Sequence, residues 1–196
     1  MAGSFWSDSS VEPKRQFRWV FGLSNHIPLW VVKSVDKPVA TVGAQEHKFF
    51  GHTYKYPGNV TWNDINITLV DPVQPDSVNI LATILRQSGY NPPVAAPQGV
   101  GVETISKKKS TNTLGEVYIK QVDAQGKPIE VWRLTNPIVK SADFGGSLSY
   151  ENEGLIEVKM TLAYDWAQLS TVNQGSRHTA NGISPTRKYW VVGNLS

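Results

Sequence analysis

Cysteine is absent from the 196-residue chain, which excludes disulfides, cysteine-ligated zinc, iron–sulfur clusters and thiol catalysis. A surplus of one charge is also missing, since 19 basic residues face 16 acidic ones and the formal net charge is +3. Such a balance gives no electrostatic footprint for nucleic-acid binding. No apolar stretch approaches the roughly 20 residues of a transmembrane helix, and residues 1–10 lack the basic and apolar regions of a secretory signal. We therefore expect no membrane partner.

Motifs that carry enzyme chemistry are also scarce. His47 and His52 lie five residues apart in a strand-like segment, a spacing that places them on opposite faces of a regular strand and is poor for a shared metal. The glycines of residues 99–104 lack the third glycine of a dinucleotide loop. Glu151 and Glu153 fall in a predicted turn, where solvated acids are the usual case. We predict no catalytic residue, no metal ligand and no cofactor.

The apolar residues alternate with polar ones along most of the chain, which is the period of β-strands. Two hairpins are expected in the second half, each with a polar turn between apolar strands. The pattern predicts seven or eight short strands and a mainly β, antiparallel fold, a sandwich or rolled barrel with one helix. The expected extended segments are residues 17–23, 29–35, 46–56, 62–70, 117–133 as a hairpin, and 147–164 as a second hairpin.

One helix is expected over residues 76–88, after a proline-rich loop and before Gly89, which suits a left-handed helix end. Residues 91–114 are expected to form a long irregular loop. The chain then divides into an N-terminal arm, residues 1–15, a β domain, residues 16–169, and a C-terminal extension, residues 170–196.

Large aromatic residues in the two terminal segments need something to cover them. Phe5 and Trp6 lie in the N-terminal arm, and Tyr189 and Trp190 lie in the extension. Packing on the chain's own core and packing on a neighbouring chain are both open. The seven tryptophans are spread over all parts of the chain, a distribution that favours core and interface anchors over a sugar-stacking cluster.

The order of these elements resembles the tail tube proteins of contractile-tailed bacteriophages, the myovirus family, over about residues 15–169. The resemblance is carried by Tyr54-Lys-Tyr-Pro-Gly58 leading into residues 60–69, by the helix that follows directly, and by Gly146-Ser-Leu-Ser-Tyr150. Its most specific piece is residues 154–166, where alternating residues end in Asp165-Trp166. The chain departs from the family by adding residues 170–196 after this point.

The resemblance implies a structural virion protein without enzymatic activity. Such proteins form hexameric rings that stack into the inner tail tube, the conduit for DNA ejection, and each subunit gives two long hairpins to a continuous barrel of about 24 strands. The implied partners are further copies of the chain, the tail sheath, a baseplate or tube initiator, the tape-measure protein and genomic DNA that passes without specific binding. The implied location is the virion tail, assembled in the host bacterial cytoplasm.

Candidate functional residues follow from this interpretation. Inter-subunit contacts are expected from Phe5, Trp6, Tyr189 and Trp190. The outer, sheath-facing side of the helix is expected to carry Asp76, Asn79, Thr83, Arg86 and Gln87. The lumen or water-facing hairpin positions are expected to be Asp64, Asn66, Thr68, Glu116, Lys120, Glu130, Glu157, Lys159 and Thr161.

Other functions fit the same composition. A tube subunit of a phage-derived injection particle or of type VI secretion has the same architecture and passes protein effectors. A β-sandwich carbohydrate-binding module predicts exposed coplanar tryptophans, and a hydrolase predicts an acid–base or nucleophile set that the sequence does not display.

Overall fold

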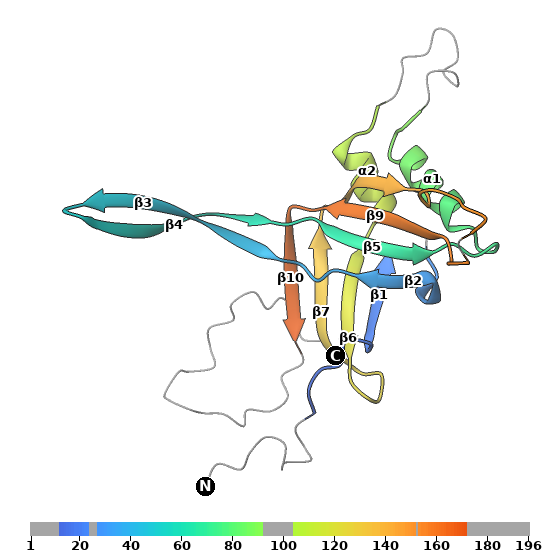
Figure 1. Ribbon diagram of the computed structural model, residues 1–196, viewed down its shortest axis with the longest axis horizontal. Coiled ribbons are helices and arrows are strands. Elements are labelled where there is room, and N and C mark those ends of the chain that lie inside the picture. Colours follow the sequence, from blue (N-terminus) through green and yellow to red (C-terminus); the bar gives the residue numbers. More distant parts are fainter. Residues whose placement is uncertain (1–11, 24–26, 92–103, 152, 172–196) are drawn as a thin grey trace.

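A computed structural model describes residues 12–23, 27–91, 104–151 and 153–171. Within these residues the chain forms two four-stranded antiparallel sheets that lie crosswise on one another, and a two-stranded arm that projects from them (Figure 1). The first sheet has the order β1-β6-β7-β10. Its strands are β1 (Trp19–Leu23), β6 (Val117–Val122), β7 (Pro128–Thr135) and β10 (Trp166–Thr171).

The second sheet has the order β2-β5-β9-β8, so β2 and β8 are its edge strands. Along β5 and β9 buried and more exposed residues alternate, so one face is apolar and packs inward. Thr161 of β9 lies directly opposite Asn66 of β5, and Met160 opposite Ile67. The strands are β2 (Val32–Val35), β5 (Ile65–Val70), β8 (Ile138–Asp143) and β9 (Glu157–Ala163).

The core lies between the two sheets and is closed by two helices. α1 (Ser77–Gln87) begins at Asp76, whose side chain accepts a hydrogen bond from the Asn79 backbone, and it ends before Gly89 at φ +108°. α2 (Lys107–Leu114) begins at the cap Ser106 and lies between α1 and β8. The buried apolar residues include Phe21, Leu23, Ile65, Ile67, Leu69, Leu81, Ile84, Leu114, Val117, Ile119, Val158, Met160 and Leu162.

The arm is a hairpin of β3 (Ala40–Phe49) and β4 (His52–Trp62) joined by the turn residues Phe50 and Gly51. It follows β2 and precedes β5, so it continues the pairing of these two strands away from the body, and it extends along the long axis of the molecule (Figure 1). A bulge between Val42 and Ala44 shifts its register. Such bulges increase the local twist of a strand pair.

The mainly β, antiparallel prediction and the main helix are confirmed, and several details are wrong. Residues 46–56 are two strands and a turn, because Phe50 and Gly51 both take positive φ, as a two-residue hairpin turn requires. Residues 147–150 form no strand, and β9 pairs instead with β8. The expected loop 91–114 ends in α2, which the Ser106 cap starts. Residues 29–31 form a 3-10 turn ahead of β2.

Among the described residues, no helix combines the length and the apolar character that crossing a membrane requires.

We predict that Met160→Ala lowers the free energy of unfolding by about 2–5 kcal/mol, because it leaves a cavity in the core between the sheets. Met160 is fully buried, whereas its neighbour Lys159 is exposed. Lys159→Ala is therefore the matched control, expected to change stability by about 0.5 kcal/mol or less. Urea unfolding of both variants tests this, and equal losses would contradict the assigned faces of β9.

Candidate functional site

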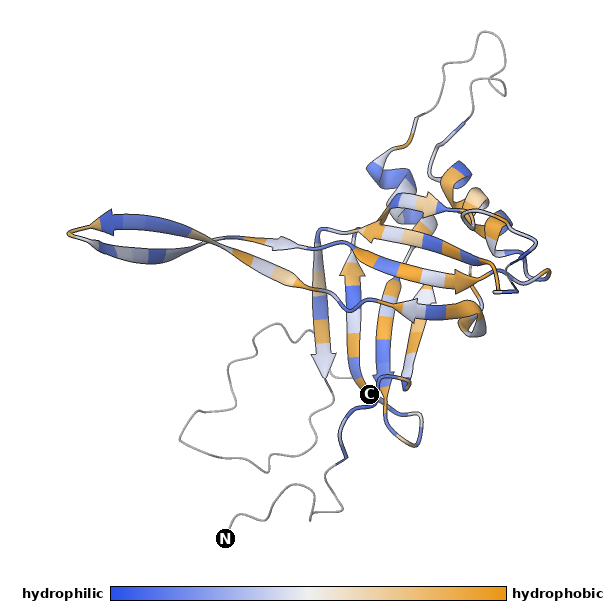
Figure 2. Ribbon diagram, viewed as in Figure 1, coloured by the Kyte–Doolittle hydropathy of each residue, from blue (hydrophilic) through white to orange (hydrophobic). Residues whose placement is uncertain are grey.

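The β3–β4 arm exposes a run of large apolar side chains on one projecting hairpin. Every residue of β3 is exposed, and β4 is exposed except for Gly58 and Trp62, which are half-buried. The large apolar side chains on it are Val42, Phe49, Phe50, Tyr54, Tyr56 and Val60. Figure 2 shows hydrophobic residues at the turn of the arm and along its root. An isolated two-stranded hairpin is marginally stable, so an apolar arm of this length indicates a surface that another chain covers.

The two faces of the arm differ in chemistry. Directly paired residues share a face, and successive pairs alternate between faces. The pairs Phe49 with His52, His47 with Tyr54 and Gln45 with Tyr56 therefore make one aromatic face, which carries no lysine and no acidic residue. The pairs Lys48 with Thr53 and Glu46 with Lys55 make the other face, which carries a Lys55–Glu46 ion pair of 3.7 Å.

The placement of the two histidines corrects the sequence prediction. His47 and His52 were expected on opposite faces, but the turn between them returns the chain, so both lie on the aromatic face. Within the described ranges, no group of three histidine, aspartate or glutamate side chains is arranged to hold a metal ion.

The root of the arm is held by contacts with the body. The Trp62 and Tyr164 rings lie 6.1 Å apart between centroids. The Asn63 backbone donates a hydrogen bond of 2.9 Å to the Val39 carbonyl. Lys37, just before β3, donates to Gln121 and to Glu130, each at 2.7 Å. These contacts fix the direction in which the arm leaves the body.

Glu130 is a buried carboxylate that accepts hydrogen bonds from three different side chains. It is only 7% exposed, although the sequence predicted a water-facing position. The strict alternation fails because β7 buries Glu130 and Val131 in succession. Its carboxylate accepts hydrogen bonds from Lys14, from Lys37 at 2.7 Å and from the Trp132 indole at 2.6 Å. Burial acts to raise the pKa of Glu130, but these three donors outweigh it and lower the pKa to about 2.

The predicted water-facing residues divide between the two sheets. Five of them lie on β5 and β9 of the second sheet, where Asn66 pairs with Thr161 and Thr68 with Lys159. The Thr161 hydroxyl donates to the Asn66 side chain at 3.0 Å, so the polar face is hydrogen-bonded across the strands. The five residues are Asn66, Thr68, Glu157, Lys159 and Thr161.

Ion pairs neutralise much of this polar face. Lys33 of β2 donates to Glu157, and this contact lowers the pKa of the Glu157 carboxyl. Lys140 of β8 donates to Asp64, another predicted position, which precedes β5. The face is therefore polar and close to neutral.

The remaining predicted residues lie elsewhere. Glu116, just before β6, is exposed and paired with Arg133, and Lys120 of β6 is half-buried over the Tyr118 ring. The sequence did not separate the two sheets, because both carry the same alternation. Phe5, Trp6, Tyr189 and Trp190 lie outside the described residues. The helix positions Asp76, Asn79, Thr83, Arg86 and Gln87 are all exposed.

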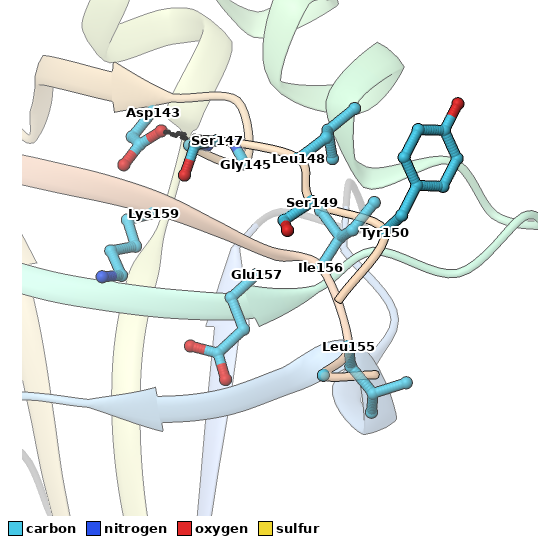
Figure 3. Close-up of a pocket in the computed structure, with 12 residues that line it drawn as sticks. Asp143, Gly145, Ser147, Leu148, Ser149, Tyr150, Leu155, Ile156, Glu157 and Lys159 are labelled. Carbon is cyan, nitrogen blue, oxygen red and sulfur yellow. Dashed lines mark hydrogen bonds between the residues drawn. The ribbon is translucent and has the colours of Figure 1, made fainter. Parts of the chain in front are cut away.

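A second apolar surface lies at the other end of the molecule from the arm (Figure 1). The β8–β9 loop and the start of β9 line an open cavity of about 610 Å³ with Leu148, Leu155 and Ile156 in its lining (Figure 3). Leu148 is 80% exposed and Tyr150 is fully exposed. Sequence reasoning missed this surface because it assigned residues 147–150 to a strand. Apolar residues set among glycines and serines were the available signal.

The tryptophans in the described residues do not form a sugar-stacking platform. Trp19, Trp30, Trp62, Trp132 and Trp166, which are the tryptophans in the described residues, lie on five different elements. Trp30 and Trp166 are exposed, and the other three are half-buried. This distribution suits anchoring roles.

We predict that Glu130→Gln lowers stability at pH 7 and that the deficit shrinks as the pH falls. A carboxyl whose pKa is about 2 in the folded chain and 4.5 as a free group stabilises the fold fully above pH 4.5 and loses that contribution as the pH falls towards 2. The shift corresponds to at most about 3 kcal/mol, reduced because both lysines are half exposed.

Urea unfolding of both proteins at pH 7, 4 and 3 measures this effect. Glu157→Gln is the control, because that ion pair is solvent-exposed and contributes little. A difference between Glu130→Gln and the unchanged protein that is the same at all three pH values would contradict the charge-based explanation.

No protein-family model and no curated protein matches the chain, but several solved structures do. The chain is similar to the tube-terminating cap of the anti-feeding prophage, with 16% identity over 88% of this chain and 100% of that one, at a TM-score of 0.58. It is also similar to a chain of the sheath–tube complex of the extracellular contractile injection system PVC, with 15% identity over 82% and 93% of the chains, at a TM-score of 0.59. A chain of the PVC sheath/tube terminator gives 15% identity over 82% and 99%, at a TM-score of 0.55. At these identities the likeness shows the fold, which is therefore the tube-like fold of contractile injection system components.

Proposed function

We propose that this chain is a non-catalytic tube subunit, copies of which form hexameric rings that stack into the inner tube of a contractile particle. The observation that carries the proposal is the second sheet. It has one apolar face on the chain's own core, one polar face towards water, and two edge strands, β2 and β8. Unpaired edges are templates for pairing with another chain.

Closure of this sheet into a ring of six copies gives a channel wide enough for duplex DNA or a small folded protein. Four strands per copy supply about 24 strands, spaced by about 4.8 Å and tilted by about 40°. The circumference is then roughly 150 Å and the backbone diameter roughly 48 Å. Side chains reduce the free width to about 38 Å, so duplex DNA or a small folded protein passes without being gripped.

The polar face of the second sheet suits the channel wall. Asn66, Thr68 and Thr161 are uncharged, and the Lys33–Glu157 and Lys140–Asp64 pairs neutralise the charges beside them. A conduit must not retain its cargo, and each uncompensated lysine would hold a phosphate. On this proposal Asn66, Thr68 and Thr161 face the lumen, whereas Glu157 and Lys159 lie at the end of this face and also line the cavity of the β8–β9 loop.

Two kinds of particle use such a conduit. The sequence resemblance implies a contractile phage tail that ejects DNA, and the structural neighbours come from injection systems. The wall accommodates either cargo, because it lacks a strong charge of one sign. In both particles we propose that the exposed side of α1 faces the sheath, that a baseplate component starts the tube, that a tape-measure protein occupies the lumen, and that the tube assembles in the bacterial cytoplasm.

We assign the β3–β4 arm to contacts between copies. None of its residues is fully buried, and its root is fixed to the body by Trp62, which packs against the core, and by Lys37. An apolar projection that is anchored at its root and otherwise lies outside its own core is suited to contact a neighbouring copy.

We predict that the unchanged protein forms six-fold rings or tubes in a concentration series, and that a shortened arm abolishes them. Residues 43–59 are replaced with Asn-Gly, a turn that suits the directly paired Val42 and Val60. The variant should fold as a monomer because its core is intact. Negative-stain electron microscopy and light scattering measure assembly, and circular dichroism checks folding.

Thr83→Ala on the exposed side of α1 is the matched control and should still form rings. Persistent monomers of the unchanged protein at every concentration would contradict the proposed function.

A further inference from the structure

The tip of the arm displays two aromatic rings in a conformation that is costly for its residues. Phe49 and Phe50 form an edge-to-face pair with centroids 4.7 Å apart. Phe50 is 87% exposed and has φ +49°, in the left-handed region that favours glycine. A phenylalanine at this turn position is unfavourable both for its backbone and for its exposure. A contact of the Phe50 ring with a surface outside its own chain would offset this cost.

The cavity of the β8–β9 loop has the complementary character. Its lining includes the exposed side chains of Leu148 and Leu155, together with Gly145 and Gly146 (Figure 3). Its volume of about 610 Å³ lies within the range of pockets that hold aromatic ligands.

The charges of the two surfaces are also complementary. Residues 46–55 of the arm carry two lysines against one glutamate and also include two histidines. The charged residues that line the cavity are Asp143 and Glu157 against Lys159. This small opposite charge favours contact of an arm with a cavity over contact between two like surfaces.

We propose that the β8–β9 cavity is a socket that receives the Phe49–Phe50 tip of the arm of a second copy. This rests on the proposed self-assembly and names the surfaces that make it. The arm and the cavity lie at opposite ends of the molecule (Figure 1), so one chain cannot join its own two surfaces. Each copy both gives a tip and receives one, which is a head-to-tail contact that continues from copy to copy.

Disulfide trapping tests the contact directly, because the chain contains no cysteine of its own. His52→Cys places a thiol beside the tip, and Ser149→Cys places one beside the cavity, and neither removes an apolar contact of the proposal. After oxidation, a mixture of the two variants should give a covalent dimer, and the double variant should give a ladder of oligomers on a non-reducing gel. Thr83→Cys on α1 replaces Ser149→Cys in the control mixture, which should give no dimer.

A second pair of variants separates docking from turn geometry. Phe50→Gly removes the ring and relieves the positive-φ turn, so it should stabilise an isolated hairpin. If the ring docks, this variant and Leu148→Ala should each raise the concentration needed for assembly about tenfold. Thr53→Ala, on the other face of the arm, should leave that concentration unchanged.

Electron microscopy of the same samples distinguishes failure of the proposed socket from failure of the proposed tube function. Rings or tubes without the 52–149 cross-link, or with normal assembly of Phe50→Gly, overturn the socket and leave the proposed function standing. Absence of any assembly overturns both.

Discussion

Apolar surface that one chain cannot cover is the constraint on which this structure depends. The core between the two sheets is complete without the arm, and the arm is held out in water with aromatic residues along one face. A two-stranded ribbon gains little from its own hydrogen bonds, so its aromatic face makes physical sense only when another surface removes it from water. The exposed β8–β9 loop at the other end presents the same problem. The proposed assembly solves both with a single repeated contact.

The position of the arm depends on a buried charge. Glu130 joins the N-terminal segment through Lys14 and the start of the arm through Lys37 to the middle of the first sheet. A buried carboxylate is strongly unfavourable when a partner is lost, so the two lysines must be in place whenever the fold is formed. Such a contact adds less net stability than apolar packing of the same size, but it restricts where the chain leaves the body. An arm that is to reach a neighbour at a fixed angle needs that restriction.

The polar face of the second sheet meets a different requirement. Its residues are satisfied by one another, through the Thr161–Asn66 hydrogen bond and the Lys33–Glu157 and Lys140–Asp64 pairs. In the proposed tube the part of this face that carries Asn66, Thr68 and Thr161 stays wet, so assembly does not desolvate these polar groups and their cost does not enter the association. Association between copies then depends on the unpaired strand edges and on the apolar surfaces at the two ends of the molecule. The same sheet can therefore both line the channel and bind neighbouring copies.

The sequence by itself determined the elements that depend on local pattern. Strict alternation in residues 156–164 and 62–70, and a helix bounded by Asp76 and Gly89, were sufficient to predict β5, β9 and α1, because burial of one face imposes a period on the chain. The ordered set of elements was also sufficient for a resemblance whose fold the solved structures support.

Only the tertiary structure decided what depends on partners distant in the sequence. The pairing of β9 with β8, the shared face of His47 and His52 and the burial of Glu130 follow from strand register and from lysines 116 and 93 residues away. The same alternation describes a strand whichever neighbour it pairs with. The sequence therefore fixes which face of a strand is apolar, whereas packing decides what that face meets and which polar residues it encloses.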